Sequence, residues 1–356
     1  MKIVVGTLPY YPTPDSGKGV DRISYYIFRE IQNLQLDYEL LGWRNSTESK
    51  IVRVLLRLIR YPKFAISKGD VYLATESYSG YLFSLFHKSP TILIIHDLNP
   101  FGGFHNAYDS LSSRINRVNT KVRYRKSILS SDIIVVPFEY TKTKLLEIFN
   151  IEPNKIKIIP YGIDLPKNFA SMNKKEISIG IKRLLFIGGT NPLDRGVDVA
   201  IEILSYILQY KEDVRLIVSC KRDRWREVKL TASKLMVEKN IDLMDFIPEG
   251  QLGEIFLSSD LFLYPSRIGF SLLVLQAMSY GIPVVASNKF DIPEFLQDYG
   301  QYFAISSPVE MADAILEILN DNKLRSHLVE KGYEICRSHT SSKMALSILD
   351  LAKDIF

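Results

Sequence analysis

The feature that most constrains the fold is an alternation of short apolar runs with helical stretches, which occurs twice along the chain. In the first part the runs include KIVVG at residues 2–6, DVYLAT at 70–75, TILIIHD at 91–97 and DIIVVP at 132–137. Each is rich in β-branched residues and ends at a glycine, a proline or a polar residue, as buried strands do. Strands that alternate with helices predict a parallel, doubly wound sheet.

The alternation restarts after a polar, irregular stretch at residues 166–182, which we interpret as a linker. Five further runs follow it: LLFIGG (184–189), VRLIVSC (214–220), DFIP (245–248), DLFLYPS (260–266) and IPVVAS (282–287). A chain of 356 residues is long enough for two full cores. We therefore predict an α/β protein with two doubly wound, Rossmann-like domains, residues 1–165 and 183–340, that face a cleft.

Helical patterns lie near the start and at the end of this arrangement. The first places Ile23, Ile27, Ile31 and Leu34 on one side of a helix. The last, at residues 341–356, repeats apolar residues at helical spacing from Met344 onward. Either domain, including the one at 1–165, offers this C-terminal helix a place to dock.

Ligands of open α/β sheets bind beyond the carboxyl ends of the strands. The loops expected at those ends are residues 6–19, 96–105, 188–196, 219–224 and 265–271. Most of the unusual residue choices of the chain fall in these loops, so they are where we look for function.

The segment PSRIGFSLLVLQAMSYG (265–281) is the most informative of them. Its turn at Ile268, Gly269, Phe270 and Ser271 would open a helix at Leu272. The first N–H groups of a helix lack internal partners and carry partial positive charge, so this end favours a phosphate. A turn further on, Gln276 could project an amide toward the same place. An isolated Gly-Phe-Ser would more often be a helix packed under a loop, so the surroundings matter.

Taken together, these motifs resemble the retaining, nucleotide-sugar-dependent glycosyltransferases of the GT-B fold, family-4 type. The matching stretches occur in the family's order and cover most of the chain: GKGV (17–20), IIHDL (94–98), SDIIVVPFEYTKTKL (131–145), KIIPYGID (157–164), LLFIGG (184–189), RGVDVAIEIL (195–204), SSDLFLYPSRIGFSLLVLQAMSYGIPVVAS (258–287) and IPEFL (292–296). Each motif is weak alone, and their order and spacing make the resemblance strong.

The resemblance implies roles for several residues. Gly17 and Gly19 match the glycine loop that lets the backbone approach the donor diphosphate, although a GxG can also be a plain turn. His96 matches a histidine that lines the donor sugar. Arg195 stands where the family has a lysine that neutralises the diphosphate, and an arginine suits that role because its planar fork binds two phosphate oxygens. A solvated arginine at a helix start is the alternative for Arg195.

The chain also departs from the family at the donor site. The strand motif places Gly188 and Gly189 beside the donor, and Gly189 stands where the family has a second arginine. Lys221, Arg222 and Arg224, in the loop after the next strand, are candidates to replace it.

Two family glutamates are changed as well. The one that holds hydroxyls of the transferred sugar is Ile268 here, which suits a deoxy sugar or an altered donor pose. The one that binds the ribose is Gln276, which still forms hydrogen bonds but carries no charge. We expect weaker nucleotide binding from this change.

The expected catalytic residues are His96, Asp97 and Arg195. In the family the departing phosphate oxygen is thought to take the acceptor's proton, so no carboxylate base is required, and Asp97 is a possible helper. Stabilisation of the leaving phosphate would be the largest contribution. No DxD metal motif lies at a strand end, so we expect no metal and no cofactor.

The charge of the chain is uneven. Residues 1–165 contain 22 lysines and arginines against 15 aspartates and glutamates. Two basic stretches, 49–63 and 114–126, could meet an anionic membrane surface, although a helix with leucine inside and arginine outside has the same pattern. Nucleic acid is not expected, because its binding signatures are missing. The expected partners are a nucleoside diphosphate sugar and a saccharide or polyprenol-linked acceptor.

No apolar run is long enough to span a bilayer and no leader is evident, so we expect a cytoplasmic protein, with a peripheral position on the inner face of the membrane as the alternative. Cys220 and Cys336 lack CxxC spacing and are expected to be buried thiols. The main alternative function is a catalytically degenerate partner subunit that binds a nucleotide sugar or glycan. A dehydrogenase is disfavoured, because LLFIGGTNPLDRG lacks GxGxxG.

Overall fold

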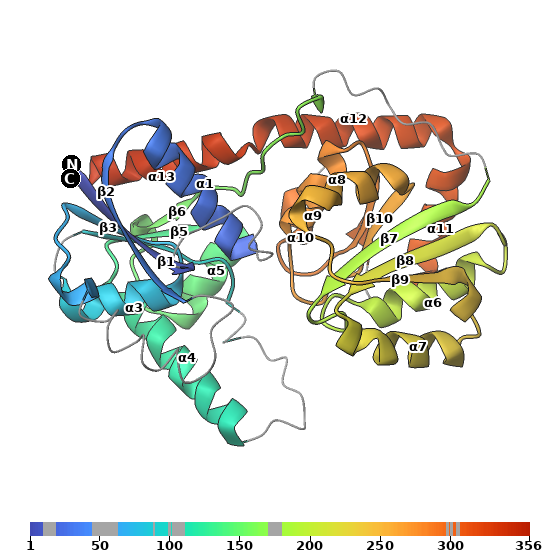
Figure 1. Ribbon diagram of the computed structural model, residues 1–356, viewed down its shortest axis with the longest axis horizontal. Helices are drawn as coiled ribbons and strands as arrows, with labels where there is room; N and C mark the ends of the chain where they lie inside the picture. The colour runs from blue at the N-terminus through green and yellow to red at the C-terminus, as the bar shows by residue number, and fades with distance from the viewer. Residues whose placement is uncertain are drawn as a thin grey trace. The chain divides into compact units, whose positions relative to one another are not determined.

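A computed structural model describes residues 1–9, 19–44, 63–87, 90–98, 101, 111–169, 180–296, 299, 302–303 and 307–356. The chain divides into two compact units (Figure 1). The first unit comprises Met1–Tyr161 and Ser341–Phe356, and the second comprises Gly162–Thr340. Each unit is an α/β structure built on its own parallel sheet.

The sheet of the first unit has, within the described residues, the strand order β2-β1-β3-β4-β5-β6. Its strands are β1 (Lys2–Pro9), β2 (Asp37–Arg44), β3 (Val71–Ala74), β4 (Thr91–Ile94), β5 (Ile133–Val136) and β6 (Ile156–Ile158). All neighbouring pairs are parallel. The central strands β3, β4 and β5 are buried along their whole length, as expected for a sheet covered on both faces.

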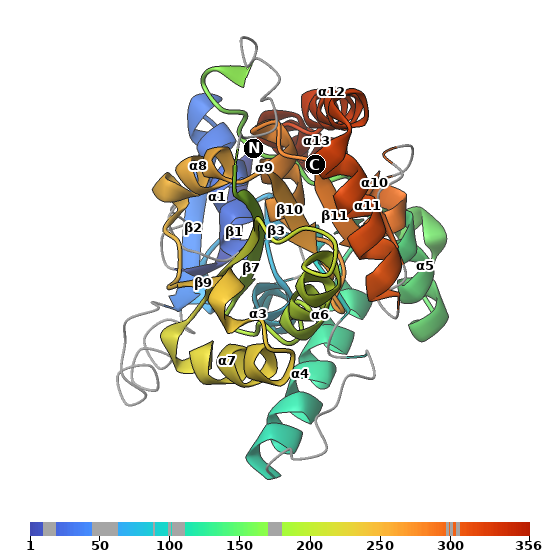
Figure 2. The same cartoon turned by 90° about the vertical axis from the view of Figure 1, so that its right-hand side faces the viewer.

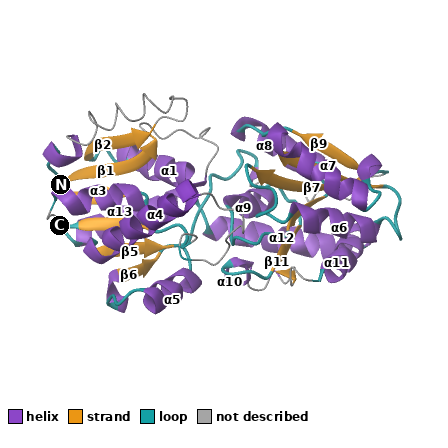
Figure 3. Cartoon of the chain, turned by 90° about the horizontal axis from the view of Figure 1, so that it is seen from below, coloured by secondary structure: helices purple, strands orange, loops and turns teal. Residues whose placement is uncertain are grey.

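Helices cover this sheet (Figure 3). They are α1 (Gly19–Asn33), α3 (Ser77–Phe86), α4 (Leu111–Ser130), α5 (Glu139–Ile148) and α13 (Ser341–Asp354). Ile23, Ile27 and Ile31 are buried, as predicted, but α1 ends before Leu34, which is exposed. The C-terminal helix α13 packs against α1, where Ser342 donates a hydrogen bond of 2.7 Å to Glu30.

The sheet of the second unit has, within the described residues, the order β12-β11-β10-β7-β8-β9. Its strands are β7 (Lys182–Gly189), β8 (Val214–Cys220), β9 (Ile241–Met244), β10 (Leu261–Tyr264), β11 (Val284–Ser287) and β12 (Tyr302–Phe303). All are parallel. The predicted fold class, two doubly wound parallel sheets with helices, is therefore confirmed.

One predicted strand of the second unit is wrong. The apolar run DFIP at 245–248 is a loop, and the strand β9 is formed by the four residues before it, IDLM. These residues pair with Leu216–Ser219 of β8 at the edge of the sheet and are only half-buried. An edge strand needs no continuous apolar run, whereas Pro248 lacks the N–H group that a strand ladder requires.

The helices of the second unit are α6 (Val197–Ile207), α7 (Trp225–Lys234), α8 (Glu249–Ser258), α9 (Leu272–Ser279), α10 (Ile292–Leu296), α11 (Pro308–Asn320) and α12 (Asn322–Ser338). Helices α6 and α11 pack side by side (Figure 2), and α12 packs on α9. Cys220 and Cys336 are free and buried, as predicted.

Several expectations fall on residues that the structure does not describe. Gly17, most of the basic stretch 49–63 and most of the linker 166–182 lie outside the described residues. Within the described part of the chain, none of the helices is long and apolar enough to cross a membrane.

Candidate functional site

The loops that follow β7, β8, β9, β10 and β11 form one edge of the second unit, which we call the carboxyl edge. They comprise residues 190–196, 221–224, 245–248, 265–271 and 288–291. Because the strands are parallel, their carboxyl ends meet along this edge. It holds nearly all the residues of the second unit that the sequence singled out.

Arg195 is tied to the turn that precedes α9. Its guanidinium donates a hydrogen bond to the hydroxyl of Tyr264, the last residue of β10. That hydroxyl donates in turn to the carbonyl oxygen of Gly269 at 2.7 Å. The structure therefore brings Arg195 and the Gly269 turn together, with Tyr264 as the link between them.

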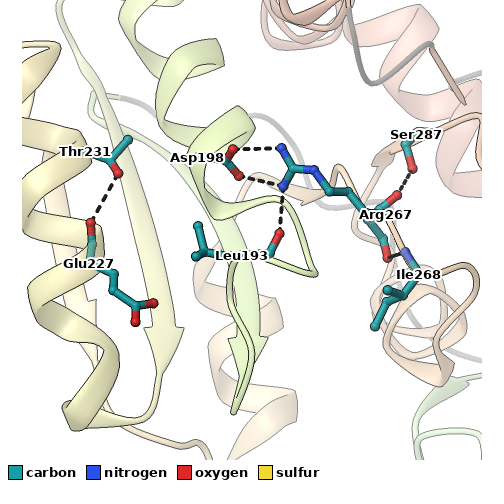
Figure 4. A network of polar contacts seen from close by, with 8 residues as sticks. Leu193, Asp198, Glu227, Thr231, Arg267, Ile268 and Ser287 are labelled. Carbon is teal, nitrogen blue, oxygen red and sulfur yellow. Dashed lines mark hydrogen bonds and ion pairs between the residues drawn. The ribbon is translucent and has the colours of Figure 1, made fainter. Parts of the chain in front are cut away.

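The other arginines of the carboxyl edge bind carboxylates. Arg267 grips both oxygens of Asp198 at 2.7 Å and donates to the Leu193 carbonyl at 2.7 Å (Figure 4). Arg222, whose side chain is 75% exposed, lies 2.8 Å from Asp245. Arg224 lies 2.9 Å from Glu227. Among the arginines described at this edge, Arg195 is the one that binds a neutral group instead of a carboxylate.

The backbone of the turn at 268–272 is already partly hydrogen-bonded. The N–H of Ile268 donates to the Ser266 hydroxyl at 3.2 Å. The N–H of Phe270 donates to the carboxylate of Asp291 at 2.8 Å. Gly269 has a φ of +85°, and a Cβ there would stand 2.7 Å from the same carboxylate oxygen. Only glycine fits at this position, and Asp291 holds one of the amides that the sequence assigned to an anion.

Helix α9 starts at Leu272 with Ser271 as its cap, since the Ser271 hydroxyl accepts from the Leu273 N–H at 3.3 Å. Ile268 and Ser271 are half-buried at this end of the helix, whereas Leu272 is buried. The predicted turn and helix start are therefore present, and the helix dipole adds partial positive charge there.

Gln276 lies deeper than the sequence suggested. Its side chain is only 7% exposed. Its Nε2 donates to Oε1 of Glu249, the first residue of α8, at 2.7 Å. A carboxylate thus stands beside the position where the family resemblance places one, but on a different helix.

Gly188 and Gly189 end β7 in different surroundings. A Cβ at Gly188 would come within 2.7 Å of Pro192, so the following loop packs closely on it. Gly189 has a φ of +58° and open space beside it, and its pairing with Cys220 follows a register shift in the sheet. The left-handed backbone at Gly189 would strain any other residue, an arginine included.

The first unit has a comparable edge where β1, β3 and β4 end. The Thr75 hydroxyl donates to the Gly6 carbonyl at 3.1 Å and accepts from the Ser24 hydroxyl of α1 at 2.7 Å. Gly19 is the first residue of α1. These bonds tie the start of α1 to the strand ends.

His96 follows β4 and has both ring nitrogens hydrogen-bonded. Nε2 lies 2.7 Å from the Thr75 carbonyl oxygen, and Nδ1 lies 2.8 Å from the Tyr161 hydroxyl. A carbonyl only accepts, so Nε2 carries the proton and Nδ1 accepts from Tyr161. Burial lowers the pKa of His96, against smaller opposing effects of the Thr75 bond and of Asp97. In this arrangement His96 is neutral and positions Tyr161.

Asp97 is half-buried next to His96. Burial raises the pKa of Tyr124 on α4, and the negative charge of Asp97 raises it further. Asp97 therefore lies close to the α4 face of the first unit.

Four residues that contact the candidate site residues were not predicted from the sequence: Tyr161, Glu249, Tyr264 and Asp291. Asp291 directly precedes the recognised IPEFL stretch, and Tyr264 ends a recognised strand, so position was a weak signal for both. Glu249 had no local signal. Within the described residues, no cluster of three or more His, Cys, Asp or Glu side chains could hold a metal ion.

Comparisons with known proteins bear on the family and the fold. Residues 170–335 match the family Glycosyl transferases group 1. The chain is similar to the D-inositol 3-phosphate glycosyltransferase of Corynebacterium glutamicum (strain R), with 22% identity over 283 residues, 74% of this chain and 67% of that protein.

Solved structures share the fold along the whole chain. The sucrose-phosphate synthase from Thermosynechococcus elongatus has a TM-score of 0.78 at 12% identity and covers 100% of this chain and 99% of its own. Anabaena HepE, solved with UDP and glucose, has a TM-score of 0.71 at 13% identity and covers 99% of both chains. The chain thus has the fold of the GT-B glycosyltransferases, and residues 170–335 match the glycosyl transferases group 1 family.

Proposed function

We propose that the protein is a glycosyltransferase that moves a sugar from a nucleoside diphosphate donor to a saccharide or lipid-linked acceptor. The observation that carries the proposal is the arrangement of Arg195, Tyr264 and the turn at Gly269. It presents, next to the start of a helix, a cation that binds no carboxylate among the described residues, and both features favour a diphosphate.

The chemistry follows from that placement. The bond between the anomeric carbon and the β-phosphate oxygen breaks, and its electron pair goes to the departing diphosphate. Arg195 and the positive end of the α9 dipole stabilise this charge as it develops. An acceptor hydroxyl forms the new bond to the anomeric carbon, and its proton passes to the departing phosphate oxygen.

Three finer points belong to the proposal. We infer that the configuration at the anomeric carbon is retained, as the family-4 resemblance implies, and that no metal takes part. A uridine diphosphate sugar is the first donor to try, because HepE was solved with UDP and glucose. Arg222 joins the diphosphate site once it leaves Asp245, since a pair this exposed contributes little.

The first unit is proposed to bind the acceptor, and His96 and Asp97 are proposed to face the transferred sugar. Burial favours the neutral form of His96, and the bonds to Thr75 and Tyr161 fix its ring, so it would orient hydroxyl groups through Tyr161. For His96 we propose this positioning role in place of the catalytic role expected from the sequence.

A second candidate, a subunit that binds the donor without turnover, is favoured by the carboxylate of Asp291 on the Phe270 amide and by Ile268. A negative charge at the anion-binding turn opposes a diphosphate, and an isoleucine provides no hydrogen bond to a sugar hydroxyl.

A panel of UDP-, GDP-, TDP- and ADP-sugars separates the two candidates. Thermal stabilisation and nucleoside diphosphate release are followed together, with and without EDTA and a lipid extract. A transferase gives both signals with one donor and keeps them in EDTA, and the product's anomeric proton coupling reports retention. Stabilisation without release under every acceptor supports the binding subunit, and no response to any nucleotide contradicts both.

A further inference from the structure

A carboxylate and an amide from two different helices pair at the carboxyl edge of the second unit. Nε2 of Gln276, in α9, donates to Oε1 of Glu249 at 2.7 Å. Glu249 begins α8 directly after the 245–248 loop, so it lies where β9 ends. The pair therefore sits one helical turn from the α9 start at which we place the diphosphate.

The pairing fixes the direction of the Gln276 amide. A carboxylate offers only acceptors, so the amide must turn its NH₂ group toward Glu249. Its oxygen, Oε1, is then buried and accepts no hydrogen bond from the described residues. A buried amide oxygen without a partner is destabilising, so the site holds Glu249 in place at a cost to the fold.

Gln276 is thus badly placed to bind a ligand itself. Its side chain is 93% covered, its nitrogen is committed to Glu249, and its oxygen is shielded. Glu249 is only half-buried. Of the two, the carboxylate is the group that a ligand can reach.

The surroundings favour a charged Glu249. The residue stands in the first turn of α8, where the helix dipole stabilises a negative charge. Burial raises the pKa of Tyr280, and the charge of Glu249 raises it further. Tyr280 stacks on Phe256 and lies so close to Gly253 that a Cβ there would be 2.6 Å from its hydroxyl. Helix α8 is therefore firmly seated beside the end of α9.

We infer that Glu249 binds the ribose hydroxyls of the nucleoside diphosphate, and that Gln276 is the positioning residue that holds it. The inference rests on the proposed function and names the residue that binds the ribose of the donor. Two neighbouring hydroxyls offer two donors to the two oxygens of one carboxylate, and an acidic side chain at a strand's carboxyl edge recognises ribose in other doubly wound sheets. The ligand class is a ribonucleoside diphosphate, in preference to its 2′-deoxy form.

The test measures the dissociation constants of UDP and 2′-deoxy-UDP by calorimetry on the full chain. If the donor panel selects another base, that nucleoside diphosphate pair is used instead. Wild type is expected to bind the ribose form about tenfold more tightly, since the hydrogen bond to a carboxylate is charge-assisted. Glu249→Gln is expected to lower this ratio to about two, because the amide offers one neutral acceptor.

Two further variants make the result specific. Gln276→Met fills similar space without the amide. It is expected to lower the ratio of the two dissociation constants about threefold, because Glu249 is no longer held. Glu254→Gln removes an exposed carboxylate from the same helix and is expected to leave the ratio unchanged. Thermal melting checks that each variant is folded.

Each remaining outcome has one meaning. The inference is overturned if Glu249→Gln leaves the ratio of the two dissociation constants unchanged. It is also overturned if the wild type binds both forms equally. In both cases the protein still binds nucleotide, so the proposed function stands. Failure of the wild type to bind any nucleoside diphosphate overturns the inference and the proposed function together.

Discussion

We propose that single charges around the turn at 268–272 set how well an anion would be held there. Arg195 reaches the turn through the Tyr264 hydroxyl, whereas Asp291 places a carboxylate on the Phe270 N–H at 2.8 Å. The two charges would act in opposite directions on the proposed diphosphate. Asp291 organises the turn and, in this proposal, weakens its attraction for phosphate.

Asp291→Asn separates these two effects, because asparagine keeps an oxygen for the Phe270 N–H and removes the charge. We expect UDP to bind about fivefold more tightly, from the loss of roughly 1 kcal/mol of repulsion at a few ångströms in a solvated site. Calorimetric titration of wild type and variant measures it. Asp291→Ala is the control, since it loses the hydrogen bond as well. Weaker binding by Asp291→Asn would mean that the carboxylate does not face the anion.

At this scale the sequence singled out candidate residues that stand on recognised motifs but not the residues that contact them. Arg195 and Gln276 were found because each follows a strand or a glycine turn at a fixed spacing. Tyr264 is 69 residues from Arg195, and Glu249 is 27 residues from Gln276. Such pairs depend on how separate loops meet at the carboxyl edge, which no local pattern encodes.

At the scale of elements, the start of α6 is locked to the loop after β10. Gly196 caps α6 with a φ of +82°, and a Cβ there would stand 1.9 Å from the Pro265 carbonyl oxygen. Arg267 in the same loop grips Asp198 in the first turn of α6 (Figure 4). These two contacts fix the position of the Arg195 loop relative to the Gly269 turn.

Gly196→Ala is expected to lower the free energy of unfolding by about 3 kcal/mol or more, from a backbone clash combined with a strained φ. The matched control is Gly250→Ala in α8, where a Cβ meets no atom within 4 Å. It should change stability by no more than about 0.5 kcal/mol. Urea unfolding of both variants measures the difference. Equal, small effects would show that the α6 start is not fixed on Pro265.

Fully buried strands were predicted well, and one half-buried edge strand was misplaced. The strands β3, β4, β10 and β11 appear in the sequence as apolar runs because both faces of each are covered. The edge strand β9 was misplaced by a few residues, since IDLM is half-buried and the more apolar DFIP beside it ends in proline.

At the scale of the whole molecule, the positive charge of the N-terminal half has a structural counterpart on α4. Val118, Val122 and Leu129 of this helix are 61%, 57% and 45% exposed. Arg125 and Lys126 are exposed among them, and together with Val122, Leu129 and Ser130 they line a shallow hollow. A helix face that exposes valine and leucine beside basic residues suits an anionic membrane surface, which we propose as the place where a lipid-linked acceptor is met.

Arg125→Glu with Lys126→Glu should reduce binding to vesicles that contain anionic lipid at least about tenfold, given roughly 1 kcal/mol per basic residue near such a surface. The matched control replaces Lys142 and Lys144 on α5 by glutamate. Both lysines have acidic partners on their own helix. Vesicle sedimentation at low and high salt measures both variants. Equal losses in the two would assign the binding to net charge and not to α4.

The central claim is that Arg195 stabilises a departing diphosphate, and its most direct test is the rate of nucleoside diphosphate release by wild type and Arg195→Ala, with the donor that the panel selects. The account predicts a fall of about 100-fold in kcat, as for loss of one preorganised charge-stabilising group, with unchanged melting. A rate within about twofold of wild type, in a folded variant, would contradict it, because no transition-state interaction would then have been removed.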